Sequence, residues 1–121
     1  ALFVYNANPL STLPDQERVR RGLMREDLFT VVFDQMLTDT ARYADVILPA
    51  TVFLEHHELS TGYGTFAAQY AQPLVEPLDQ ARPNYEVFGE LIERMGLSRP
   101  GDDFSPEGML RALCDWDKKG F

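Results

Sequence analysis

Three short apolar runs, each followed by polar residues, mark the first half of the chain. They cover Leu2–Tyr5, Phe29–Phe33 and Asp45–Pro49, and they are rich in β-branched and aromatic side chains. Because continuous apolar runs suit strands that are covered on both faces, these segments predict a parallel sheet. Pro49 ends the third strand, since proline has no N–H to donate to a neighbouring strand.

Helical patterns separate and follow these runs. The first and second predicted helices connect the three strands, and the other two lie in the second half of the chain. Their expected limits are Leu13 or Pro14 to Arg25, Thr40–Ala44, Tyr85–Met95 and Ser105–Trp116. Ser11 or Thr12 is the expected cap of the first helix. Between the second and third helices, residues 56–65 are polar and predict loops, and Phe66–Val75 predicts a strand or hairpin.

Two polar side chains, Asn8 and Asp34, follow the first two expected strands. A right-handed crossover makes these strands parallel, so both carboxyl ends lie on one edge of the sheet, where open α/β sheets bind ligands. A carboxylate there accepts hydrogen bonds from ribose hydroxyls or from the N1–H and amino edge of guanine, and an Asn amide both donates and accepts. The structural alternative is that Asp34 caps the following turn and Asn8 forms an Asn-Pro corner.

Composition narrows the classes of function. The chain has 121 residues, of which 45% are hydrophobic, and this indicates one folded domain. The formal net charge of -8 argues against a surface that binds nucleic acid or anionic membranes. No apolar stretch is long enough to insert into a membrane, and one cysteine excludes an internal disulfide. The chain starts at Ala1, next to a strand-like run, and we therefore interpret the chain as a piece of a longer protein.

Several common catalytic and binding motifs are missing from the sequence. It contains no GxGxxG, no GxxxxGK[ST] phosphate loop and no GxSxG elbow. The adjacent His56 and His57 do not place two ligands on one helix face, so we interpret them as part of a polar surface loop. The candidate site therefore depends on Asn8 and Asp34.

The residues around this site resemble the molybdopterin oxidoreductase family. The similarity is carried by Asn8-Pro9, Val31–Asp34 and Thr38–Glu55, within a region from about Leu2 to Gly96. Its most specific part is the pattern TxTAxxADVILPAT, which starts at Thr38. The family comprises enzymes with a bis-molybdopterin guanine dinucleotide cofactor, related to formate dehydrogenase, nitrate reductase and dimethyl sulfoxide reductase. The resemblance implies a three-layer, Rossmann-like α/β domain with a mostly parallel sheet.

The resemblance also implies roles for parts of this chain. Residues 1–96 would be a fragment of the domain that binds molybdopterin guanine dinucleotide, and residues 97–121 a linker and a helix packed on the same domain. The family's cofactor-binding positions fall on Asn8, Phe33, Asp34, His56 and Asn84. No catalytic or metal-ligating residue is expected in this fragment, which would be inactive alone.

The rest of the machinery would lie outside this chain. The implied metal is molybdenum or tungsten, and the implied iron–sulfur centre is a 4Fe-4S cluster in the missing part of the parent protein. The suggested partners are the remaining domains of the parent chain and an iron–sulfur electron-transfer subunit. The compartment, cytoplasmic or periplasmic, is left open.

One segment departs from the pattern of many family members. After Glu55 the sequence HHELSTGYGTFAAQYAQPLVEP lacks the Asn and the EGR of the usual GTFxNxEGRxQ segment. It is similar to a subgroup with EHDDLYxSYGxxYLQ, so no substrate is transferred from the best-known members. Two alternatives stay open. One is a metal-free structural or electron-transfer subunit, like the large iron–sulfur subunit of respiratory complex I. The other is an unrelated nucleotide-binding module.

Overall fold

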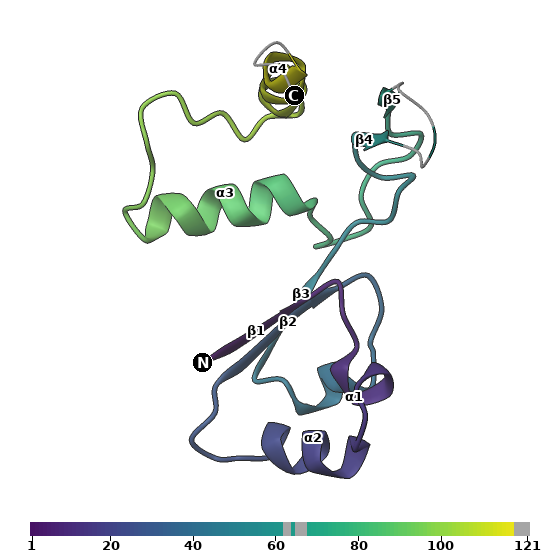
Figure 1. Cartoon of the computed structure of the whole chain (residues 1–121), viewed down its shortest axis with the longest axis vertical. Coiled ribbons are helices and arrows are strands. Elements are labelled where there is room, and N and C mark those ends of the chain that lie inside the picture. Colours follow the sequence, from purple (N-terminus) through teal and green to yellow (C-terminus); the bar gives the residue numbers. More distant parts are fainter. Residues whose placement is uncertain (62–63, 65–67, 118–121) are drawn as a thin grey trace. The chain divides into compact units, whose positions relative to one another are not determined.

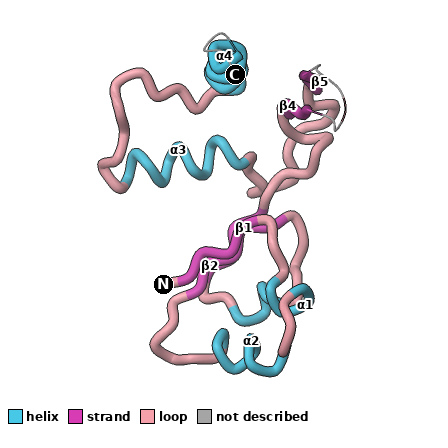
Figure 2. Tube along the Cα trace, in the orientation of Figure 1, coloured by secondary structure: helices cyan, strands magenta, loops and turns pink. Residues whose placement is uncertain are grey.

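The chain folds into two compact units, which are described separately. The computed structural model describes residues 1–61, 64 and 68–117 (Figures 1 and 2). The first unit consists of Ala1–Ala50 and Asp79–Ala81, and the second of Thr51–Leu78 and Arg82–Phe121. Within the described part of the chain, no helix is long and apolar enough to cross a membrane.

A parallel sheet forms the centre of the first unit. Its strands are β1 (Leu2–Tyr5), β2 (Thr30–Asp34) and β3 (Val46–Pro49), in the spatial order β1-β2-β3. Both strand pairs are parallel, with β2 in the middle. The three predicted strands, their parallel direction and the α/β class are therefore confirmed. The middle strand carries the core because it has a neighbour on each side.

The helices of this unit are shorter than the sequence predicts. They are α1 (Pro9–Thr12), α2 (Gln16–Leu23) and the 3-10 helix η1 (Thr40–Tyr43), and Figure 1 shows α1 and α2 on the same side of the sheet. The helix expected from Leu13 or Pro14 to Arg25 is observed as α2, which is shorter at both ends, and the expected cap at Ser11 or Thr12 is wrong. Asp15 has a left-handed backbone (φ 57°) that no helix continues through, and its carboxylate caps α2 by accepting from the Arg18 N–H.

Apolar side chains from the sheet and from η1 form the small core of the first unit. Val4 of β1, Val32 of β2 and Ala41 of η1 cluster together, and Ala44 packs against them. Val32 and Phe33 are fully buried. Because this core joins β1, β2 and η1, it holds the ends of β1 and β2 in register.

A two-stranded hairpin and two helices make up the second unit. The hairpin pairs β4 (Glu58–Thr61) with β5 (Ala68–Ala71) in antiparallel fashion. The expected loop over residues 56–65 is therefore wrong at β4. The polar sequence of β4 does not show the pattern of a strand. The strand forms because it pairs with β5, which begins seven residues after β4 ends. The expected strand over Phe66–Val75 is observed at Ala68–Ala71, while positions 66 and 67 lie outside the described residues.

The predicted helices of the second half are confirmed. Helix α3 spans Asn84–Arg94 and α4 spans Pro106–Asp117. Gly96 follows α3 with φ 67°, the left-handed conformation expected of a helix stop. Ser105 caps α4, because its hydroxyl accepts a hydrogen bond from the Gly108 N–H at 3.0 Å.

Two helical glycines provide a matched test of packing in the two units. A Cβ on Gly89 in α3 would lie 2.9 Å from Phe104, whereas a Cβ on Gly22 in α2 would meet nothing within 4 Å. Alanine favours a helix over glycine by about 1 kcal/mol at either position. We expect Gly22→Ala to raise the free energy of unfolding by about 0.5–1 kcal/mol. We expect Gly89→Ala to lower it by about 1–3 kcal/mol through overpacking.

Urea unfolding of both variants checks this prediction. A similar stabilisation by the two substitutions would show that Phe104 does not pack against α3 in solution.

Candidate functional site

The carboxyl ends of β1 and β2 form a shallow polar depression in the first unit. It has a volume of about 320 Å³ and is lined by Asn6, Ala7, Asn8, Asp34 and Gln35. The parallel pairing of β1 with β2 brings these segments together, although about 25 residues separate them in the chain. The prediction that Asn8 and Asp34 share one crevice is therefore confirmed.

The Asp34 carboxylate divides its two oxygens between the protein and the depression. Its Oδ1 accepts hydrogen bonds from the Gln35 N–H at 2.7 Å and the Met36 N–H at 3.4 Å. No hydrogen bond from the described residues reaches Oδ2. Asp34 therefore does cap the following turn, as the structural alternative predicts, but it uses only Oδ1 to do so. Its Oδ2 is available as an acceptor for a ligand.

The Asn8 side chain is held from two directions. Its Oδ1 accepts from the Thr40 hydroxyl at 2.7 Å and from the Thr40 N–H at 3.3 Å. Its Nδ2 donates to the Ser11 hydroxyl at 3.0 Å. The main-chain carbonyl of Asn8 accepts hydrogen bonds from two N–H groups of α1, so Asn8 also forms the corner before Pro9. One N–H of the Asn8 amide is not required by these contacts.

Phe33 supports the site from inside the core. It is fully buried, and its ring stacks on Tyr5 with the centroids 5.8 Å apart. The ring is therefore occupied by packing, and its carbonyl accepts from the Asn6 N–H at 3.4 Å. Phe33 connects the ends of β1 and β2. A direct contact between Phe33 and a cofactor stays a prediction.

The other two predicted contacts, His56 and Asn84, lie in the second unit. His56 Nδ1 is 2.8 Å from the Thr51 hydroxyl, and its Nε2 is 3.8 Å from the Glu58 carboxylate. Asn84 is the first residue of α3 and is half-buried. These neighbours orient His56 within its own unit. The part that His56 and Asn84 play in ligand binding stays a prediction.

The sequence did not predict three of the residues that line the depression, Asn6, Ala7 and Gln35, as possible ligand contacts. Asn6 has a left-handed backbone (φ 47°), which turns the chain sharply after β1 and places Ala7 on the rim. Gln35 follows Asp34 directly. Only their positions in the sequence could have indicated these residues, because each lies close to a candidate residue, Asn8 or Asp34, at the end of a strand.

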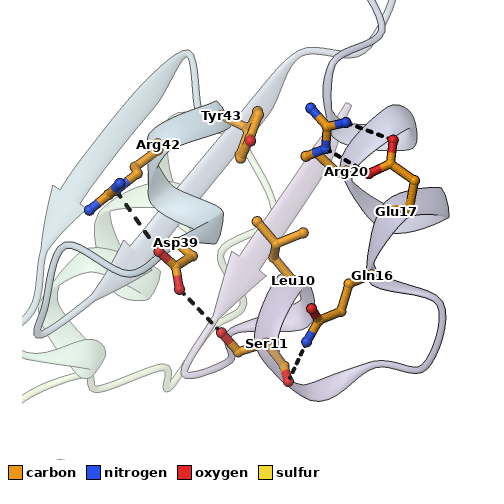
Figure 3. A pocket seen from close by; sticks show the side chains of 8 residues that line it. All are labelled: Leu10, Ser11, Gln16, Glu17, Arg20, Asp39, Arg42 and Tyr43. Atoms are coloured by element: carbon orange, nitrogen blue, oxygen red, sulfur yellow. Dashed lines mark hydrogen bonds and ion pairs between the residues drawn. The ribbon is translucent and has the colours of Figure 1, made fainter.

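A larger hollow of about 450 Å³ lies on the helical side of the first unit (Figure 3). Its walls come from α1, α2 and η1. The lining residues are Leu10, Ser11, Gln16, Glu17, Arg20, Asp39, Arg42 and Tyr43. Both arginines are paired with carboxylates, Arg20 with Glu17 of the same helix at 2.6 Å and Arg42 at 4.0 Å with Asp39, which precedes η1. Hydrogen bonding to Arg20 lowers the pKa of the Glu17 carboxyl.

We place the candidate site in the smaller depression for a chemical reason. The larger hollow is lined by exposed charges, and each of its two arginines already has a carboxylate nearby, so its net charge attracts a ligand only weakly. The depression instead offers an uncommitted carboxylate oxygen next to an oriented amide. Among the described residues, no group of three or more His, Cys, Asp or Glu side chains is placed to hold a metal ion.

Comparison with known proteins relates this strand-end site to a family. The model of the family described as molybdopterin oxidoreductase matches residues 1–94. The chain belongs to the molybdopterin oxidoreductase family. The matched region contains all of the described first unit and both residues, Asn8 and Asp34, that face the depression.

Individual molybdopterin oxidoreductase relatives agree with this assignment. The probable oxidoreductase YoaE of Bacillus subtilis is 43% identical over 95% of this chain and 17% of its own length. The dimethyl sulfoxide/trimethylamine N-oxide reductase of Rhodobacter capsulatus is 34% identical over 89% of this chain and 13% of its own. The structure of acetylene hydratase from Pelobacter acetylenicus matches with a TM-score of 0.72 and 32% identity, over 86% of this chain and 15% of that one. The chain thus spans less than a fifth of these relatives.

Proposed function

We propose that this chain is one segment of a longer molybdopterin-dependent oxidoreductase, here called the parent protein. In that protein it holds the guanosine end of a molybdopterin guanine dinucleotide. The observation that carries this proposal is the Asp34 carboxylate at the end of β2, with Oδ1 bound to the backbone and Oδ2 bound to no donor of the described residues. Family membership supports the parent's class, and the relatives' greater length supports a segment role.

The hydrogen bonds of Asp34 favour ribose over the guanine base as its ligand. The N1–H and amino groups of guanine point the same way and need two acceptor oxygens side by side. Oδ1 is already bound to two backbone N–H groups, so Asp34 offers only Oδ2. One carboxylate oxygen accepts a ribose hydroxyl, and its second lone pair accepts the neighbouring hydroxyl.

Asn8 adds the complementary donor on the other side of the depression. Its carbonyl oxygen is bound to Thr40, and its amide nitrogen has a second N–H. A donor and an acceptor on adjacent strand ends fit the mixed donors and acceptors of a sugar or the oxygens next to it. The depression is shallow and wholly formed by polar or small residues, in keeping with a nucleotide tail that is partly covered by other segments.

The residues present fit the organic part of the implied cofactor. Asp34 and Asn8 would hold its nucleotide tail, with Phe33 fixing the two strand ends beneath them. When bound, the metal of the cofactor supplies oxygen-atom or electron transfer, while the protein supplies binding and orientation. The contribution of this chain is then to bind and orient, and we assign none of its residues a catalytic role.

Nucleotide analogues test the proposal. We would titrate the chain with GMP, inosine monophosphate and 2′,3′-dideoxy-GMP, and follow the Asp34, Gln35 and Asn8 amide signals by NMR. Inosine lacks the amino group of guanine, and the dideoxy compound lacks the ribose hydroxyls. We expect GMP and inosine monophosphate to bind alike and the dideoxy compound to bind at least about tenfold more weakly, because it lacks both hydroxyls that donate to the Asp34 carboxylate.

The outcomes separate the two interpretations of Asp34. If inosine monophosphate binds more weakly than GMP, and 2′,3′-dideoxy-GMP binds as well as GMP, Asp34 contacts the guanine base rather than the ribose. Shifts at residues remote from the depression, with none at Asp34 or Asn8, would overturn the assignment of this site.

A further inference from the structure

Thr40 is a buried residue that holds the segment after β1 at the candidate site. Its side chain is fully buried, although it belongs to the short helix η1. The hydroxyl donates to Asn8 Oδ1 at 2.7 Å and accepts from the Leu10 N–H at 3.1 Å. A single side chain of η1 therefore holds both the amide of Asn8 and the first turn of α1.

The backbone of Thr40 determines which end of the Asn8 amide faces inward. The Thr40 N–H lies 3.3 Å from the Asn8 amide and is only a donor, so the atom facing it has to be the carbonyl oxygen. The hydroxyl is consistent with this choice, because it donates to the Asn8 side-chain oxygen while it accepts from the Leu10 N–H. The NH2 group is thereby left on the side of Ser11, to which one of its N–H bonds donates, and Asn8 itself lines the depression.

We infer that Thr40 is a positioning residue of the nucleotide site, which orients Asn8 so that it presents an N–H donor to the ligand. This inference rests on the proposed function and adds the residue that sets the polarity of the site. Without the hydroxyl, the Asn8 side-chain oxygen keeps only the longer contact to the Thr40 N–H, and the NH2 group keeps its exposed contact to Ser11, so the amide is held less firmly. The site then loses a fixed donor beside the Asp34 acceptor, and binding weakens without a change in Asp34.

Thr30 offers a matched control on the same strand system. Like Thr40 it is a fully buried threonine, but its hydroxyl has no hydrogen-bond partner in the part of the chain that the structure describes. It lies at the amino end of β2, at the opposite end of the strand from Asp34. A threonine-to-valine change removes the hydroxyl and keeps the shape at both positions. A generic cost of replacing buried threonine would therefore appear in both variants.

The test measures cofactor release from the folded parent protein. We would follow the fluorescence of oxidised pterin released over time from wild type and from the variants Thr40→Val, Thr40→Ser, Thr30→Val and Asp34→Ala. We expect Thr40→Val to release its cofactor about tenfold faster, the factor expected for one hydrogen bond. Thr40→Ser, which keeps the hydroxyl, and Thr30→Val are expected to match wild type.

The pattern across variants distinguishes the failure of each proposal. Fast release from Asp34→Ala together with wild-type release from folded Thr40→Val would overturn the role of Thr40 alone. Wild-type release from Asp34→Ala would overturn the proposed function itself. If Thr30→Val and Thr40→Val accelerate cofactor release equally, the effect comes from altered core packing and not from the orientation of Asn8.

A measurement on the wild-type chain keeps the inference testable if Thr40→Val does not fold. The Thr40 hydroxyl proton is expected to exchange slowly enough to be seen by NMR, with a nuclear Overhauser effect to the Asn8 side-chain amide. Rapid exchange of this proton with water would show that the hydroxyl does not hold Asn8, and would overturn the inference.

Discussion

Replacing Asp34 by alanine in the parent protein is expected to lower its pterin and metal content, while turnover per bound metal changes much less. Asp34 Oδ2 is the one carboxylate oxygen lining the depression that no described residue occupies. Loss of a hydrogen bond to a charged group costs about 1.5–3 kcal/mol, or a factor of roughly 10–100 in affinity. The chemistry belongs to the metal, so the molecules that keep their cofactor should work nearly normally.

Elemental analysis of molybdenum and tungsten, with pterin fluorescence on anaerobically purified protein, provides the measurement. Asp27→Ala is the matched control, because Asp27 is an exposed carboxylate of the same unit that pairs with Arg25 at 2.5 Å. Equal metal loading of Asp34→Ala and wild type would contradict the assignment of Asp34. A folded wild-type parent with neither metal nor pterin, made in a cofactor-competent host, would instead favour the metal-free subunit related to complex I.

The second large effect is expected from Phe33→Ala, which should lower the free energy of unfolding of the first unit by about 3–5 kcal/mol. Phe33 is fully buried in the middle strand and stacks on Tyr5, so its removal leaves a cavity between two strands. A domain of this size is stable by about 5–15 kcal/mol, so such a loss takes a large share of its stability. We also expect the depression to lose its shape, because Phe33 joins the ends of β1 and β2.

Urea unfolding followed by NMR measures this loss unit by unit. Signals of Val4 and Val32 report on the first unit and signals of α3 on the second, and only the first set should shift to lower urea. Phe29→Ala is the control, since Phe29 is 53% exposed and its loss should change stability by no more than about 0.5 kcal/mol. Equal shifts for the two variants would show that Phe33 is not the core residue of this sheet.

The strands of the first unit were predictable because their signal is local. The apolar runs that end at Tyr5, Phe33 and Pro49 in the sequence correspond to strands that end at Tyr5, Asp34 and Pro49 in the sheet. The break between α1 and α2 was not predictable in this way. Asp15 has an unusual backbone conformation, and the pattern of apolar residues continues across it. Strand β4 was missed because a polar, exposed hairpin strand is identified by its partner rather than by its own residues.

By itself the sequence determined the α/β class, the family, and the two polar residues that follow the first two strands. These depend on short apolar runs and on a specific motif, which are properties of neighbouring residues. Only the tertiary structure decided how Asn8 and Asp34 are used. Hydrogen bonds from Thr40, 32 positions away, orient the Asn8 amide, and two backbone N–H groups occupy one oxygen of Asp34. Such contacts join segments that are distant in the chain, so the order of residues does not reveal them.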